Sequence, residues 1–150
     1  MKRYLVEKAI AAPQARVWRV LADITHWHEW TASITRIEVL HGILMGPGAA
    51  IFIKQPKLPP NLWRVTDWRS GEAFTWEART PGLHIVASHT LAADKQGCRV
   101  QLALTFDGFL SGVAGFLSGK LTQRYLQMEA DGLKARSESE PDPSPRLLLA

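Results

Sequence analysis

The sequence predicts an α+β protein in which an antiparallel sheet of about seven strands curls around a long C-terminal helix. One strand-like run opens the chain, six more follow between residues 33 and 106, and a single long helical pattern comes after them. Short turn signals separate the six runs, which is typical of an antiparallel meander. Helices do not alternate with the strands, so a doubly wound parallel fold is excluded.

The first 30 residues combine one strand with two short helices. Residues 3–10, RYLVEKAI, read as a strand, and residues 13–22 begin with Pro and place apolar residues at helical spacing from Val17 to Ala22. Asp23 is expected to begin a second short helix.

The six later strand-like runs are bounded by Gly, Pro and polar residues. Such residues mark turns because they favour backbone conformations that strands do not adopt. The runs are SITRIEVL, AAIFIKQ, LWRVTDW, AFTWEAR, LHIVASHTL and CRVQLALTF, with breaks at MGPG, PKLPPN, RSGE, TPG and ADKQG.

Residues 110–136 are predicted to form one helix, because their apolar side chains repeat every three or four positions. Gly112, Gly115 and Gly119 lie in its first turns, and close packing or tolerance on the opposite face explains them more simply than a mobile end that admits a ligand. The Pro- and Ser-rich residues 137–150 are expected to be a flexible tail, leaving one domain over residues 1–136. The predicted apolar stripe consists of Leu110, Val113, Ala114, Leu117, Leu121, Tyr125 and Met128.

Composition and charge favour an ordinary globular domain of the cytoplasm. The chain is 46% apolar and 21% charged, and we find neither a secretion signal nor a membrane-spanning run. The last fourteen residues hold three acids and one Arg, so residues 1–136 carry +6, from 17 basic and 11 acidic residues. The basic residues are scattered singly, which argues against nucleic-acid binding. Cys98 is the sole cysteine and is expected to be a buried structural residue.

Four segments carry a resemblance to a known family. They are AAPQARVWRVLADITHWHEW, IKQPKLPPNLWRVTDWRSGEAFTWEARTPG, HTLAADKQGCRVQLALTFDG and QRYLQMEADGLKAR. In order and spacing, residues 1 to about 136 resemble the polyketide cyclase/dehydrase branch of the START-like (SRPBCC) superfamily. The resemblance implies a helix-grip fold with a deep, mostly apolar cavity between sheet and helix. Members bind lipids, polyketides, hormones or quinones, and only some are enzymes.

The stretch LADITHWHEW raises the question of a metal site. His26 and His28 point in different directions on a helix, and zinc needs three or four converging ligands. We therefore expect no metal site and no cofactor. Trp27 and Trp30 can share one helical face and pack over the open end of the cavity. Core packing without ligand contact is the favoured interpretation for Trp27. For Trp30, core packing and ligand contact are equally favoured.

Strand alternation sorts the cavity candidates, because successive side chains point to opposite faces. His89 shares its parity with the apolar residues Leu83, Ile85, Ala87 and Leu91, so it is predicted to face inward, neutral and with a lowered pKa. Two interpretations of His89 are equally favoured: a core histidine that is hydrogen-bonded to a carbonyl or water, and a residue that contacts the ligand. The same two interpretations apply to Gln55 and Tyr125. The candidate ligand-binding residues are Trp30, Gln55, Trp63, Trp76, Ile85, His89, Leu104, Leu121 and Tyr125.

Two functions remain open. The first is a carrier or binding protein for a hydrophobic or aromatic small molecule, lipid-, polyketide- or quinone-like, without stable membrane insertion and as a monomer or homodimer. The alternative is a cyclase or dehydratase type of enzyme that uses His89 as general base. No carboxylate is predicted near His89, because Asp67, Glu77 and Asp107 fall outside or at strand ends. The ligand itself is not specified by the sequence.

Overall fold

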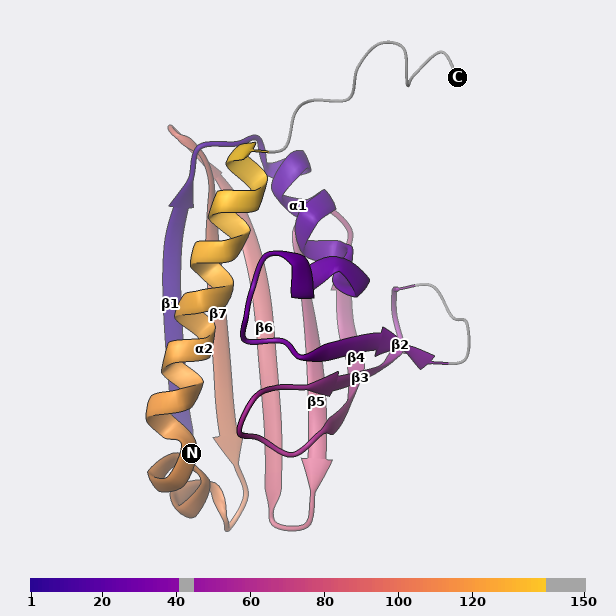
Figure 1. Ribbon diagram of the computed structural model, residues 1–150, viewed down its shortest axis with the longest axis vertical. Coiled ribbons are helices and arrows are strands. Elements are labelled where there is room, and N and C mark those ends of the chain that lie inside the picture. Colours follow the sequence, from indigo (N-terminus) through magenta and orange to yellow (C-terminus); the bar gives the residue numbers. More distant parts are fainter. Residues whose placement is uncertain (41–44, 140–150) are drawn as a thin grey trace.

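The computed structural model describes residues 1–40 and 45–139. A seven-stranded antiparallel sheet, in the order β1-β7-β6-β5-β4-β3-β2, curls around the helix α2 (Figure 1). The short helices α1 and η1 lie beside the C-terminal half of α2 (Figure 1). The elements are β1 (Lys2–Ile10), α1 (Gln14–Ala22), η1 (Ile24–Glu29), β2 (Arg36–Val39), β3 (Ala50–Lys54), β4 (Asn61–Arg69), β5 (Ala73–Thr80), β6 (Leu83–Asp94), β7 (Gly97–Asp107) and α2 (Ser111–Ser139).

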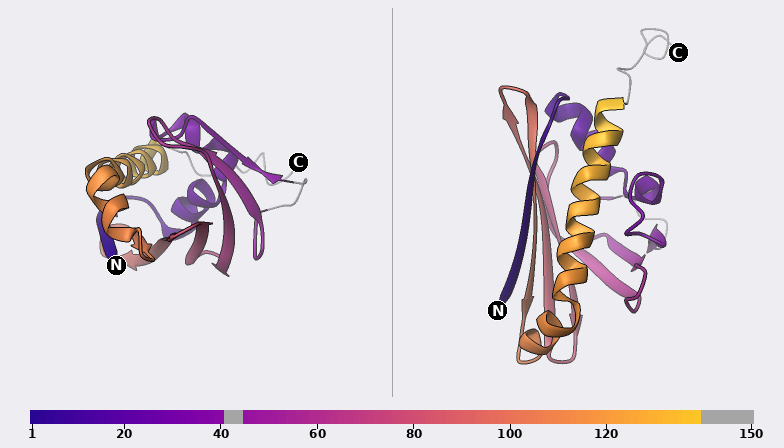
Figure 2. Two further views of the ribbon diagram at one scale, coloured as in Figure 1. Left: turned by 90° about the horizontal axis from the view of Figure 1, so that it is seen from below. Right: turned by 60° about the vertical axis from the view of Figure 1, so that its left-hand side comes forward.

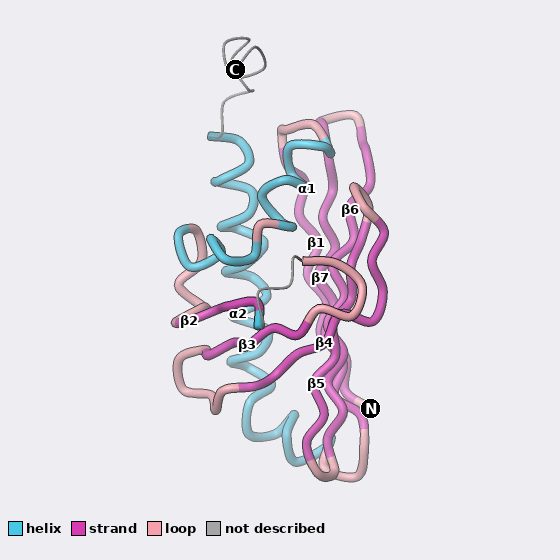
Figure 3. The backbone as a smooth tube through the Cα atoms, turned by 90° about the vertical axis from the view of Figure 1, so that its right-hand side faces the viewer, coloured by secondary structure: helices cyan, strands magenta, loops and turns pink. Residues whose placement is uncertain are grey.

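The sheet is curved, and its curvature makes room for a site. The long strands β1, β7, β6 and β5 form one wall, while β2 and β3 turn toward the side of the sheet on which α2 lies (Figures 2 and 3). Each strand pairs antiparallel with the strand next to it in the sheet. The predicted antiparallel α+β architecture is therefore confirmed. No helix of the described residues is long and apolar enough to cross a membrane.

Strand alternation is also confirmed. On β7, Val100, Leu102 and Phe106 are buried, whereas Arg99 is exposed. On β5, Phe74, Trp76 and Ala78 are buried and form the inner face of the strand. Because one face of a curved sheet packs on the core, the period-two pattern predicts these inner residues correctly. Ala103, of the opposite parity on β7, is buried as well.

The predicted stripe of α2 is correct only in part. Leu110, Val113 and Leu117 are exposed, whereas Tyr125 is buried as predicted. The buried face also contains Thr122, Leu126, Glu129, Ala130 and Leu133. The helix lies so close to β1 that its contact surface is made of small residues. A Cβ atom on Gly119 would be 2.7 Å from the Tyr4 hydroxyl, and one on Gly115 would be 2.9 Å from the Lys2 side chain. These two glycines therefore permit close packing.

The C-terminal boundary of the helix also differs from the prediction. The helix continues to Ser139, three residues past the expected end of the domain at residue 136. Ser137, expected in the flexible tail, is buried. The remainder of the predicted tail lies outside the described residues.

Candidate functional site

A cavity of about 230 Å³ lies between the inner face of the sheet and α2. An apolar cavity of about 150 Å³ is already large enough to bind benzene, so this volume accommodates an aromatic ring with substituents. Aromatic and aliphatic side chains dominate its wall. They include Trp27, Ile34, Ile53, Leu58, Trp63, Trp76, Leu83, Ile85, Leu102, Leu104, Phe106 and Leu126, and the polar groups include Gln55, Asn61, His89, Ser118, Thr122, Tyr125 and Glu129.

His89 is fixed in this wall by the strand beside it. Its Nδ1 lies 3.1 Å from the carbonyl oxygen of Phe74, its partner across the β5–β6 pair. A carbonyl can only accept, so Nδ1 carries the proton and Nε2 of the neutral ring is an acceptor. Burial lowers the pKa of His89 from 6.5 to about 4, against the opposing effect of the hydrogen bond to Phe74. His89 therefore faces inward, as strand parity predicts, and its burial favours the neutral form.

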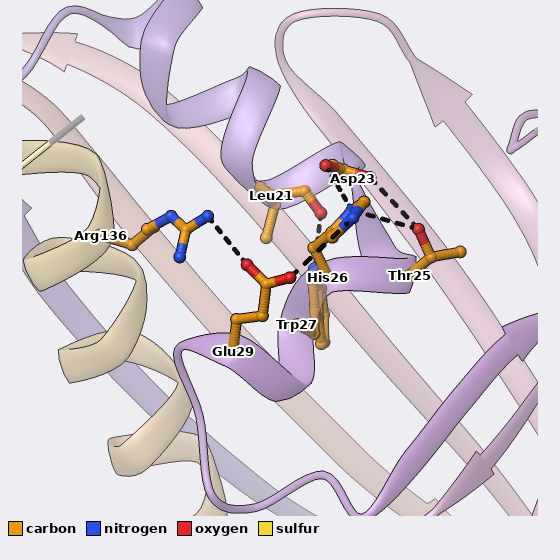
Figure 4. Close-up of polar contacts among 7 residues, drawn as sticks. All are labelled: Leu21, Asp23, Thr25, His26, Trp27, Glu29 and Arg136. Atoms are coloured by element: carbon orange, nitrogen blue, oxygen red, sulfur yellow. Dashed lines mark hydrogen bonds and ion pairs between the residues drawn. The ribbon is translucent and has the colours of Figure 1, made fainter. Parts of the chain in front are cut away.

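Trp27, and not Trp30, belongs to the cavity wall. Trp27 is 1% exposed, and its indole Nε1 donates a hydrogen bond to the Leu21 carbonyl, 2.8 Å away (Figure 4). Its ring lies against Trp76 and His89, with centroid distances of 5.4 Å and 5.7 Å. The expected ranking of the two tryptophans is therefore reversed.

Trp30 faces away from the cavity because the 3₁₀ helix η1 ends before it. Ile24 and Trp27, one 3₁₀ turn apart, are both buried, whereas Trp30 leaves the helix with φ −125° and ψ −2°. Its side chain lines a separate surface hollow together with Arg19, Asp23, His26 and Arg136.

His26 and His28 lie on the surface of the protein. His26 Nδ1 lies 2.9 Å from the Asp23 carboxylate, and this pairing raises the pKa of His26 (Figure 4). His28 is exposed, and Arg136 forms an ion pair with Glu29 at 3.0 Å. Among the described residues, no group of three or more His, Cys, Asp or Glu side chains could hold a metal ion.

A carboxyl group that the sequence interpretation missed lies in the cavity. Glu129 of α2 is buried and lines the cavity, 3.4 Å from the hydroxyl of Ser33, which in turn is 2.7 Å from the hydroxyl of Thr31. Burial raises the pKa of Glu129 from 4.5 to about 7, which the Ser33 hydrogen bond only partly offsets. The polar groups expected in the cavity are His89, Gln55 and Tyr125, so Glu129 is an addition to that set. Helical spacing could have predicted that Glu129 faces the cavity, because it lies four residues after the inward-facing Tyr125 and therefore on the same face of the helix.

Tyr125 and Gln55 are part of the wall near the loop between β3 and β4. The hydroxyl of Tyr125 donates to the Pro56 carbonyl at 2.5 Å, so its proton is committed to holding this loop. Lys54 Nζ donates to the carbonyls of Gln55 and Leu58, at 2.6 Å and 2.5 Å. These bonds fix the loop that contributes Gln55, Leu58 and Pro59 to the cavity wall.

Four of the five remaining predicted ligand-binding residues line the cavity, and one does not. Trp63, Trp76, Ile85 and Leu104 line the cavity, as strand parity predicts. Leu121 does not line it, because the buried face of α2 is displaced by one position from the predicted stripe and Thr122 takes that place.

Comparison with known proteins gives one family. The family model described as polyketide cyclase/dehydrase and lipid transport matches residues 1–138. No match was found among curated proteins.

Solved structures share the fold at low sequence identity. A hypothetical protein of Helicobacter pylori is 14% identical, with a TM-score of 0.78 over 91% of this chain and 88% of the other. A protein of Thermus thermophilus is 19% identical, with a TM-score of 0.75 over 91% and 97%. The Zhui aromatase/cyclase of a Streptomyces species is 15% identical, with a TM-score of 0.73 over 91% and 93%. At such identities the likeness shows the helix-grip fold and not the function.

Proposed function

The chain belongs to the polyketide cyclase/dehydrase and lipid transport family, and from this premise we propose that it binds a hydrophobic or aromatic small molecule in its cavity, as a carrier or binding protein. The observation that carries the proposal is the cavity of about 230 Å³ lined by tryptophans and aliphatic side chains. Small-molecule sites combine such apolar walls, which supply affinity, with a few polar groups that set orientation.

The two buried ionisable groups indicate what kind of ligand fits. The Nε2 atom of His89 offers an acceptor to a ligand hydroxyl, because Nδ1 already donates to Phe74. Burial raises the pKa of Glu129 to about 7, and in its protonated form Glu129 offers a donor to a ligand carbonyl. We therefore propose a largely apolar ligand that carries both a hydroxyl and a carbonyl group.

Native mass spectrometry tests the proposal directly. The protein purified from its host is sprayed intact and again after denaturation, and a bound molecule adds mass only to the folded state. For protein without such a molecule, the fluorescent probe 8-anilinonaphthalene-1-sulfonate serves instead. We expect the probe to bind the folded wild type with one site, and Trp76→Ala to weaken this binding. Binding unchanged by Trp76→Ala would show that the probe does not enter the cavity and would count against the proposal.

A second candidate function, an enzyme of the cyclase or dehydratase type, gains support from Glu129. Acid–base catalysis is most efficient when the pKa of the group lies near the operating pH, which favours Glu129 at about 7 over His89 at about 4. In an enzyme, Glu129→Gln lowers turnover by about a hundredfold or more with little loss of binding. In a carrier, the same substitution changes affinity only.

A further inference from the structure

The surface around the start of α2 is apolar. Phe109, Leu110, Val113, Phe116 and Leu117, here called the apolar patch, are exposed in the loop between β7 and α2 and in the first two turns of the helix. Phe109 and Phe116 leave 85% and 89% of their surface in solvent. Single exposed apolar residues are normal, but several large ones together mark a site of interaction. The helical spacing of three and four residues makes Val113, Phe116 and Leu117 neighbours.

Basic side chains lie at the same end of the molecule as the apolar patch. Lys120 and Arg124 continue the same exposed face of α2, one and two turns after Phe116. Lys2 and Arg3 begin β1, and Arg79 is the last residue but one of β5, at the end of the molecule where α2 starts (Figure 1).

These cations have few acidic neighbours. Residues 108–128 contain no Asp or Glu. Within the described residues, none of the five basic side chains forms an ion pair.

We propose that this end of the molecule docks peripherally on a membrane surface that contains anionic phospholipids. Apolar side chains enter the boundary between headgroups and acyl chains, and flanking Lys and Arg residues pair with anionic headgroups. The apolar patch supplies two phenylalanines, a valine and two leucines for the first role, and Lys120 and Arg124 lie beside them for the second.

A second copy of the chain fits less well. An interface with two-fold symmetry would bring the same patch, with Lys120 and Arg124 beside it, to both sides and so concentrate cations at the contact.

The position of the patch relates docking to the cavity. Ala114 and Ser118 line the cavity from the same turns of α2 that carry Phe116 and Leu117 on the outside. The first turn also closes against the β5–β6 turn, where the Leu110 backbone N–H donates to the Gly82 carbonyl at 2.9 Å. A ligand that leaves the cavity beside this turn would enter the apolar part of the bilayer. This last step rests on the proposed function, whereas docking itself does not.

Sedimentation with vesicles tests the docking. The probes are vesicles of phosphatidylcholine alone and of phosphatidylcholine mixed with phosphatidylserine. We expect the full chain to bind the mixed vesicles and the combined Phe116→Ser, Leu117→Ser variant to bind at least about tenfold more weakly. The control is Leu62→Ser, because Leu62 is also exposed but lies on β4 outside the patch. Reversing Lys120 and Arg124 to Glu should weaken binding about fivefold or more for each charge, whereas Lys95→Glu in the β6–β7 turn should leave it unchanged.

Light scattering coupled to gel filtration is measured on the same proteins. If the wild type binds neither kind of vesicle, or the Phe116→Ser, Leu117→Ser variant binds as well as the wild type, the docking proposal is wrong. A dimer that the same variant converts to a monomer, without vesicle binding by either, would assign the patch to a second copy instead. Ligand binding is assayed without vesicles, so docking and the proposed function can fail separately.

Discussion

The imidazole of His89 stacks on the ring of Phe74, with centroids 4.2 Å apart and planes 17° from parallel, and its Nδ1 is bonded to the carbonyl of the same residue. Trp76 and Trp27 meet the imidazole edge-on, with centroids 5.1 Å and 5.7 Å away. Ring and backbone contacts to one neighbour therefore fix both the position and the tautomer of His89. A side chain held in this way presents its Nε2 in one orientation, which suits recognition of a ligand group.

The first prediction compares polar and apolar parts of the wall. His89→Ala removes one hydrogen bond to a ligand, worth roughly 0.5–1.5 kcal/mol, so affinity should fall about tenfold at most. Trp76→Ala removes a large buried surface and should weaken binding more. Titration calorimetry with the ligand identified by mass spectrometry measures both. A greater loss for His89→Ala would mean that polar recognition dominates.

The second prediction concerns pH between about 4.5 and 6.5. The pKa of Glu129 is raised on folding to about 7, so its contribution to stability is present below pH 4.5 and is lost as the pH rises through 7. The pKa of His89 is lowered to about 4, so its contribution is present above pH 6.5 and is lost as the pH falls through 4. Between these limits the two slopes have opposite signs, and each amounts to about 1.4 kcal/mol per pH unit at most. They largely cancel in the wild type.

Single variants separate the two slopes. In Glu129→Gln the His89 slope is no longer opposed by that of Glu129, so the free energy of unfolding should increase with pH across this range relative to the wild type. In His89→Phe the Glu129 slope is no longer opposed, and the free energy should decrease with pH relative to the wild type. Urea unfolding at several pH values measures both. Parallel pH profiles for the wild type and Glu129→Gln would show that Glu129 keeps an ordinary pKa.

The third prediction distinguishes the two tryptophans. Trp27→Phe leaves the buried Leu21 carbonyl without its indole donor and opens space beside Trp76, so it should destabilise the protein by about 1–3 kcal/mol. Trp30→Phe, at the partly exposed site, should cost less than Trp27→Phe. Denaturant midpoints of the two variants check this order. Equal losses would contradict the assignment of Trp27 alone to the cavity wall.

The sheet could be predicted from the sequence because its physical rule has few alternatives. In a strand with one buried face, either the odd-numbered or the even-numbered residues face the core. On the strand of His89, the apolar residues around it show which set is buried. The same rule places Trp63, Trp76, Ile85 and Leu104 in the wall. Segment boundaries follow from Gly and Pro, which strands exclude from their interiors.

The helix faces could not be predicted in the same way. The strongest apolar stripe of α2 begins with Leu110, Val113 and Leu117, yet these side chains are exposed, because Gly115 and Gly119 fit the helix against Tyr4. A contact surface made of small residues has no hydrophobic signal. The apolar periodicity therefore predicted the wrong face for the first turns of the helix, and it did not indicate that Glu129 is buried. For η1, a 3₁₀ helix that ends at Glu29 separates Trp27 from Trp30 in a way that α-helical spacing does not indicate.

The last prediction tests close packing where α2 crosses the end of η1. A Cβ atom on Gly132 would lie 2.0 Å from the carbonyl oxygen of Trp30, which is backbone and cannot move aside independently. Gly132→Ala should therefore destabilise the protein by about 1–3 kcal/mol, although alanine favours helices more than glycine does. Gly112→Ala is the matched control, because no atom lies within 4 Å of its added Cβ, and it should be neutral or slightly stabilising. Thermal unfolding followed by circular dichroism compares them, and a stabilised Gly132→Ala would show that α2 and η1 are not packed this closely in solution.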